Sequence, residues 1–190
     1  LAADRDVLAV GPGLGQEIGT FELIEEILKI DKPLVLDADG LNSLEDLDKL
    51  NQRQAATILT PHPGELARLV DKSIPEIQVD RIEIATDFAT TYQVYLVLKG
   101  ARTVIATPEG QVYLNRTGNS GLATGGSGDV LTGLIAGQLA QNLEPAEAIQ
   151  LAVYLHGKAA DLGVIDLTEY SLLPSNLLDY LPQAIKSITI

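Results

Sequence analysis

Short, continuously apolar runs alternate along this chain with longer segments of helical periodicity, and this alternation strongly constrains the fold. Four apolar runs each lead into a cluster rich in glycine, proline or aspartate: Val7–Val10, Leu34–Leu36, Thr57–Thr60 and Tyr95–Leu98. Runs this short and uninterrupted are typical of strands buried on both faces. Helical patterns separate them, over Glu17–Ile30, Leu41–Leu50, Gly64–Val70 and Pro75–Thr91. The alternation predicts an α/β fold with a largely parallel sheet and flanking helices.

The second half of the chain adds a hairpin and more helices. Val104–Thr107 and Gln111–Leu114 flank a Pro-Glu-Gly turn, which predicts two antiparallel strands. Helical patterns follow the glycine-rich segment, over Pro145–Leu162 and Asn176–Ser187. At 190 residues and 46% hydrophobic, residues 1–190 are expected to form a single domain. Because the chain contains no methionine, we interpret it as a truncated piece of a longer protein.

Charge and cysteine content exclude several classes of function. Thirteen basic and 26 acidic residues give a net charge of −13, and no Lys/Arg cluster offsets it. Binding to nucleic acid or to an anionic membrane is therefore not expected. The absence of cysteine excludes disulfides and thiolate sites, and no apolar run approaches the length of a transmembrane helix. An anionic ligand would then be held by backbone amides and a few cations, and we expect a cytoplasmic location.

The segment 118–141 carries the clearest functional signal. Five glycines, among them Gly125, Gly126 and Gly128, lead to Asp129 and then to an apolar helical pattern. Glycines allow close backbone approach to a ligand, and a helix that begins directly after them directs unpaired N–H groups at an anion, most often a phosphate. Asp129 either caps this helix or accepts a proton from a hydroxyl that attacks phosphorus. We favour the second interpretation, because capping does not explain the glycines.

Other loops follow the predicted strands at the same edge of the sheet, where ligands of open α/β folds bind. The segment GPGLG (11–15) does not match the dinucleotide fingerprint GxGxxG, and we interpret it as a turn that lets a substrate approach the backbone. In PHPGE (61–65) two prolines fix the position of His62, which favours contact with a ligand. Glu65 is equally well explained by the helix dipole or by a place near a metal. Lys99, which ends a strand and precedes Gly100, is a candidate nucleotide contact.

For three further sets of residues, a purely structural role is an alternative to a functional one. Asp37, Asp39 and Asn42 are equally consistent with orienting a metal or substrate and with forming turns and caps. His156 is expected to be a packed histidine within its helix. Gly133 and Gly137, one turn apart, are expected to let their helix lie close against a neighbour.

Taken in order, GPGLG, DADGLN, TPHPGE, KGART and GNSGLATGGSGDVLTGLIAG resemble the ADP-dependent NAD(P)H-hydrate dehydratase family of the ribokinase-like superfamily. The resemblance covers nearly the whole chain. It implies a ribokinase-like fold and the repair of hydrated NADH or NADPH. ADP or ATP, with Mg²⁺, would phosphorylate the hydrate hydroxyl, and loss of phosphate would restore the dihydronicotinamide. Members usually carry a further segment before the GPGLG strand, which is absent from these 190 residues.

The resemblance also assigns roles to individual residues. Asp129 would be the catalytic acid/base, and Gly13 and His62 would contact the hydrate together with it. The nucleotide would be bound by the anion-binding glycines and by the KGART segment: Lys99, Gly100, Ala101, Arg102, Thr103, Gly125, Gly126 and Gly128. Glu65 remains the metal candidate. We further expect a homo-oligomer and a fused or separate NAD(P)H-hydrate epimerase.

Two other functions remain open. A ribokinase-like kinase acting on a thiazole or pyrimidine alcohol would use similar glycine and aspartate chemistry. A nucleotide-binding module without catalytic activity would retain the same loops. An NAD-dependent oxidoreductase is disfavoured by the glycine spacing.

Overall fold

A computed structural model of the protein describes residues 4–188 and is built around a six-stranded sheet whose strands lie in chain order. The strands are β1 (Leu8–Val10), β2 (Leu34–Leu36), β3 (Thr57–Leu59), β4 (Tyr95–Leu98), β5 (Val104–Ala106) and β6 (Val112–Leu114). The first four strands are parallel, β5 is antiparallel to β4, and β6 is antiparallel to β5. The largely parallel sheet and the hairpin predicted from the sequence are both confirmed.

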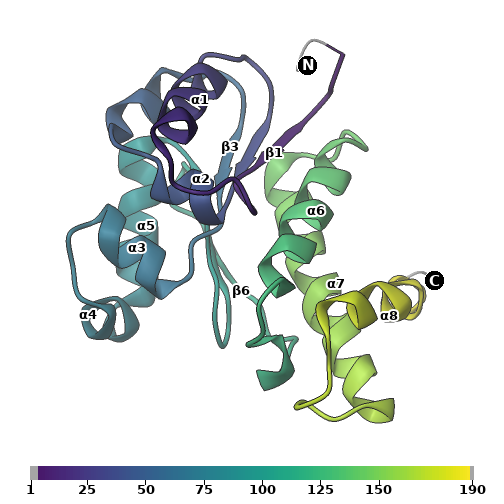
Figure 1. Ribbon diagram of the computed structural model, residues 1–190. Helices are drawn as coiled ribbons and strands as arrows, with labels where there is room; N and C mark the ends of the chain where they lie inside the picture. Colours follow the sequence, from purple (N-terminus) through teal and green to yellow (C-terminus); the bar gives the residue numbers. More distant parts are fainter. Residues whose placement is uncertain (1–3, 189–190) are drawn as a thin grey trace.

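Helices cover both faces of the sheet, which gives three layers (Figure 1). The crossover helices of the parallel half lie on one face: α1 (Ile18–Leu28), α2 (Ala38–Asn42), α3 (Pro63–Leu69), α4 (Ile74–Val79) and α5 (Arg81–Tyr92). The opposite face is covered by α6 (Ser127–Leu139) and α7 (Pro145–Asp166), and α8 (Pro174–Lys186) packs on α7. Two 3₁₀ helices complete the described elements, η1 (Leu47–Gln52) and η2 (Ser120–Leu122).

Alternating side chains of the central strands supply two separate cores. Leu34, Leu36 and Leu59 pack with α1 to α5, whereas Val35 and Ile58 pack with α6 and α7. All five are fully buried. A sheet covered by helices on both faces needs apolar residues at every strand position, which explains the uninterrupted apolar runs. This packing fixes the carboxyl ends of β1 to β4 at one edge of the sheet.

Two predicted helices are in fact interrupted. The predicted helix Leu41–Leu50 is replaced by α2, a short loop and η1, because Asp46 accepts a hydrogen bond from the Asp48 amide and so starts a separate turn. The predicted helix Pro75–Thr91 divides into α4 and α5 at Asp80, whose ψ of 39° departs from helical geometry.

Two packing expectations are wrong for the residues that the structure describes. β1 is not buried on both faces, since Ala9 is exposed and Leu8 and Val10 are half-buried. Gly133 and Gly137 lie on an exposed face of α6, where a Cβ added at either position meets no described atom within 4 Å. Within residues 4–188, no helix is long and apolar enough to cross a membrane.

Candidate active site

A cavity of about 860 Å³ opens where the carboxyl ends of β3 and β4 meet the start of α6. Its walls come from two loops, a longer segment and two helices, namely residues 62–63, 99–103, 115–120 with 122–124, and the α6 and α7 residues Ser127, Gly128, Leu131, Val153, His156 and Gly157. The KGART segment and Gly128 therefore line one cavity, as the sequence predicted that they would meet. Gly125 and Gly126 immediately precede α6 but are not part of this lining.

Residues 125–128, called the anion-binding turn after the role that the sequence predicts for them, lead into α6. Gly126 is the N-cap residue with φ of +91°, a conformation that favours glycine, and it provides no side-chain cap. No hydrogen bond within residues 4–188 engages the backbone N–H of Gly128 or of Asp129. A helix N-terminus with free amides and the positive end of the dipole is suited to hold a phosphate.

Asp129 occupies the first turn of α6, directly after the cavity-lining Gly128. Its side chain is exposed, and no hydrogen bond or ion pair to another described residue occupies it. It does not cap α6, because the N-cap is Gly126 and the helix has no side-chain cap. A free carboxylate next to an anion-binding turn can accept a proton from a hydroxyl brought to that turn.

Lys99 belongs to a buried ion cluster rather than standing free. Its Nζ lies 2.6 Å from Asp37 Oδ1 and 3.8 Å from Glu65 Oε2. Asp37 is buried at the end of β2, and its Oδ2 accepts a hydrogen bond of 2.8 Å from Thr132 Oγ1 on α6. A Cβ added to Gly128 would lie 3.3 Å from Lys99 Nζ, so the ammonium group sits against the anion-binding turn.

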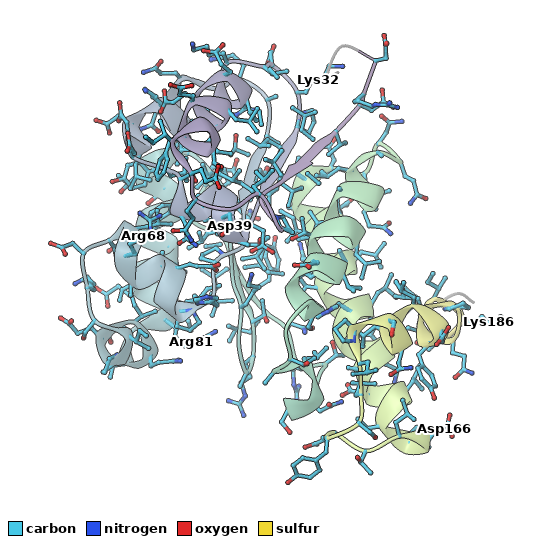
Figure 2. All side chains as sticks on the ribbon, viewed as in Figure 1. Lys32, Asp39, Arg68, Arg81, Asp166 and Lys186 are labelled. Carbon is cyan, nitrogen blue, oxygen red and sulfur yellow. The ribbon has the colours of Figure 1, made fainter. Side chains whose placement is uncertain are left out.

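This cluster resolves the open interpretation of Asp37. The Asp37 carboxylate, at the end of β2, contacts Lys99 after β4 and Thr132 on α6, and so connects the ends of these two strands to the helix. Thr132 was missed in the sequence, although its place one turn after Asp129 on the predicted helix was a usable signal. Asp39 instead binds the GPGLG loop, where its Oδ2 accepts from the Gly15 amide at 2.9 Å (Asp39 is labelled in Figure 2). Asn42 lies at the end of α2.

The KGART turn is held from outside the cavity by Arg81, which the sequence analysis missed. Arg81, labelled in Figure 2 at the start of α5, donates to the Leu98 carbonyl at 3.1 Å and to the Lys99 carbonyl at 3.4 Å. Its guanidinium packs against Gly100, whose φ of +136° requires glycine. Burial lowers the pKa of Arg81 from its ordinary value, but a guanidinium remains charged.

His62 and Glu65 form a reciprocal cap at the start of α3. His62 Nδ1 accepts hydrogen bonds from the amides of Gly64 and Glu65, and Glu65 Oε2 accepts from the His62 amide. Because Nδ1 is an acceptor, a neutral His62 carries its proton on Nε2. The histidine side chain is 57% exposed at the cavity wall. The two-proline loop thus has a structural explanation, and ligand contact by His62 stays a prediction.

The other predicted contacts lie as follows. A Cβ at Gly11 would stand 1.7 Å from the Asp37 carbonyl oxygen, so the GPGLG loop packs directly on the end of β2. Gly13, with φ of +72°, is exposed and open, and its contact with a hydrate remains a prediction. In the described part of the chain, no group of three or more His, Cys, Asp or Glu side chains is arranged to hold a metal. Glu65, the metal candidate of the sequence, caps α3 and lies 3.8 Å from Lys99 Nζ, and its place near a metal stays a prediction.

His156 is packed, as expected, but it also reaches the anion-binding turn. Its Nε2 lies 3.0 Å from the Ser127 carbonyl oxygen and 3.3 Å from Ser127 Oγ. The side chain is buried and lines the cavity. Burial lowers the pKa of His156 to about 4, and the Lys99 charge acts in the same direction, against the hydrogen bond to Ser127. The imidazole is therefore neutral at pH 7.

Residues 115–119 of the cavity wall pack against α7. This contact was not predicted from the sequence. Asp161 accepts hydrogen bonds from the Gly118 amide at 2.9 Å and from Asn119 Nδ2 at 3.1 Å. Thr117 Oγ1 donates to the Tyr154 carbonyl at 3.0 Å, and the loop lies directly on Gly157. The spacing of Tyr154, Gly157 and Asp161 by three and four residues places them on one helix face.

Known proteins match this sequence along nearly its whole length. The profile of the family described as NAD(P)H-hydrate dehydratase matches residues 1–183. A bifunctional NAD(P)H-hydrate repair enzyme of Moorella thermoacetica is 48% identical over 188 residues, which are 98% of this chain and 36% of the relative. The chain thus spans about a third of the length of that relative.

Solved structures show the same fold. The ADP/ATP-dependent NAD(P)H-hydrate dehydratase of Bacillus subtilis, co-crystallized with ATP and Mg²⁺, is 40% identical with a TM-score of 0.88 over 97% of this chain and 65% of the other. A ribokinase-like superfamily protein of Enterococcus faecalis is 30% identical with a TM-score of 0.79 over 96% of this chain and 63% of the other. The predicted ribokinase-like α/β fold is confirmed.

Proposed function

This chain belongs to the NAD(P)H-hydrate dehydratase family, and we propose that it supplies the ADP- or ATP-dependent dehydration of hydrated NADH or NADPH. One observation supports the chemistry above all others. The unoccupied amides of the anion-binding turn adjoin both a nucleotide-sized cavity and the free carboxylate of Asp129. Phosphoryl transfer needs a phosphoryl donor, groups that stabilise the developing negative charge and a base, and the start of α6 offers the last two beside a cavity with room for the donor.

In the proposed reaction Asp129 accepts the proton of the hydrate hydroxyl as its oxygen attacks the terminal phosphorus of the nucleotide. The bond between that phosphorus and the oxygen that bridges it to the next phosphate breaks, and the shortened nucleotide leaves. The amides at residues 128 and 129 stabilise the charge on the transferred group. The carbon–oxygen bond of the phosphorylated hydrate then breaks. Loss of phosphate and of a ring proton restores the dihydronicotinamide.

The nucleotide would lie against KGART and residues 115–119, and the hydrate would approach Asp129 from the side of Gly13 and His62. Mg²⁺ is part of the proposal only as the companion of the nucleotide phosphates, and no protein ligand is assigned to it. The relatives' bifunctional name is consistent with a partner or fused activity acting on the same hydrate. A cytoplasmic location and a homo-oligomeric state complete the proposal.

The test is to incubate the purified protein with NADH hydrate and ADP, and separately ATP, while following the dihydronicotinamide absorbance and the release of phosphate. Both signals should rise together in equal amounts, and neither should rise without nucleotide. The Asp129→Asn variant is the matched control, because it retains the turn and removes the base. A stable phosphorylated alcohol without recovered absorbance would instead identify a small-molecule kinase, and nucleotide binding without either signal would identify a binding module.

A further inference from the structure

The peptide unit between Ser127 and Gly128 contacts His156 through its carbonyl and belongs to the cavity wall through Gly128. A peptide group is planar, with its carbonyl and its N–H pointing in opposite directions. The Ser127 carbonyl oxygen lies 3.0 Å from His156 Nε2. The Gly128 N–H is the opposite end of the same unit, and Gly128 lines the cavity. Any group that fixes the carbonyl therefore fixes the direction of the N–H.

The proton positions in this contact follow from the chemistry. A carbonyl oxygen only accepts, so His156 Nε2 must carry the hydrogen and donate it. Ser127 Oγ, at 3.3 Å, is close enough to share the same donor. The imidazole is buried, and burial together with the charge of Lys99, which lies close to Gly128, disfavours a second proton. His156 thus acts as a neutral donor in a fixed tautomer.

The turn needs such a tether because its own backbone is permissive. Gly126, with φ of +91°, precedes Ser127, and Gly128 follows it, so two residues without Cβ atoms flank Ser127. No side chain caps this helix. A hydrogen bond donated to the carbonyl also polarises the peptide group, which makes its N–H a better donor to an anion.

We infer that His156 is a positioning residue, which through the Ser127 carbonyl orients and polarises the Gly128 N–H that receives the phosphate. The inference rests on the proposed function for its effect on turnover. Its effect on phosphate binding stands separately.

The experiment compares His156→Leu, which removes the donor, with His156→Gln, whose amide can still donate to the Ser127 carbonyl. Calorimetry measures affinity for ADP and for adenosine, which lacks phosphate. We expect the leucine variant to lose about 10-fold in ADP affinity with adenosine affinity unchanged, and to lose about 10- to 100-fold in kcat with little change in KM for the hydrate. The glutamine variant should stay within about 3-fold of the parent in every measurement.

Two further variants separate this role from general stability. Leu155→Ala opens the core beside the same position on α7, away from the cavity lining, so it should lower the melting temperature without changing the ratio of ADP to adenosine affinity. His156→Asn places an amide one carbon short of the glutamine variant and should reproduce the defect of the leucine variant, which keeps the test valid if the latter does not fold.

The inference would be overturned if the ratio of ADP affinity to adenosine affinity were unchanged in His156→Leu or His156→Asn. It would also be overturned if His156→Gln lost as much ADP affinity and kcat as His156→Leu. If the parent protein dehydrates no hydrate, the proposed function fails. The affinity ratio still decides whether His156 orients the turn.

Discussion

Acidification should destabilise this protein through His156, and replacing that residue should remove a defined part of the pH dependence. The pKa of the buried imidazole is lowered from 6.5 to about 4, first by burial and also by the charge of Lys99. Below pH 6.5 the His156 imidazole is protonated in the unfolded chain, whereas in the folded protein it stays neutral until the pH approaches 4. Protonation therefore favours unfolding, and the stability contributed by the neutral histidine is complete above pH 6.5 and is lost as the pH falls toward 4.

The size of the effect follows from the two pKa values. One pKa unit corresponds to about 1.4 kcal/mol, so a folded pKa of about 4 against 6.5 implies a loss of about 2 kcal/mol at pH 5 and about 3 kcal/mol at pH 4. Such a loss is a large fraction of the typical stability of a domain. Carboxylates also titrate in this range, but they are common to the parent and the variant and drop out of the comparison.

The assay is urea unfolding of the parent protein and of His156→Gln at several pH values between 7.5 and 5. The sequence pI is about 4.4, so measurements down to pH 5 avoid precipitation near zero net charge. The free energy of unfolding of the parent should fall relative to that of the variant by about 2 kcal/mol over this range. Parallel curves for the two proteins would refute a buried, neutral histidine at this position.

Other predictions concern single positions around the cavity. Asp129→Asn should lower turnover by about 10²- to 10⁴-fold, with ADP affinity by calorimetry nearly unchanged; turnover near that of the parent would exclude Asp129 as the base. Gly128→Val should lower ADP affinity by about 10-fold or more in a folded protein, because its Cβ would lie 3.3 Å from Lys99 Nζ, where the anion approaches; unaltered binding would contradict the anion site. Gly157→Ala should cost about 1–3 kcal/mol in urea unfolding, since its Cβ would stand 2.3 Å from Thr117 Oγ1. Gly133→Ala, on an open helix face, should instead gain about 0.5–1 kcal/mol.

The central strands could be predicted from the sequence because buried strands appear in it as uninterrupted apolar runs. β2 and β4 begin and end at the predicted residues, since strands covered on both faces must be apolar throughout. The helix break near Asp46 was missed because a local side-chain hydrogen bond outweighed a continuous apolar period, and nothing in the apolar period marks the change of backbone conformation at Asp80. The burial of β1 was overestimated, since an apolar pattern does not reveal which strand lies at the edge.

The candidate site was predicted in its parts but not in its connections. Lys99 and Gly128 line one cavity and Asp129 directly follows Gly128, because the carboxyl ends of parallel strands converge; their roles stay predictions. The hydrogen bonds from Thr132 to Asp37 and from His156 to Ser127 join residues 95 and 29 positions apart. Contacts at such separations depend on how α6 and α7 cross the sheet, and no local spacing in one sequence specifies them.

The cations that line the cavity differ in whether an acidic side chain already compensates their charge. Lys99 lies between the carboxylates of Asp37 and Glu65, so its charge is already compensated when an anion arrives. Its position against Gly128 follows from that cluster, which makes it part of the scaffold that holds α6 to the sheet. The dipole and free amides at the start of α6 remain to attract phosphate, together with the exposed cavity-lining Arg102 and Arg116, which form no ion pair with another described residue. The proposed binding of an anionic nucleotide by a chain with a net charge of −13 is therefore reasonable, because Lys99 compensates Asp37 and Glu65, whereas Asp129 stays unpaired beside the turn as the proposed base.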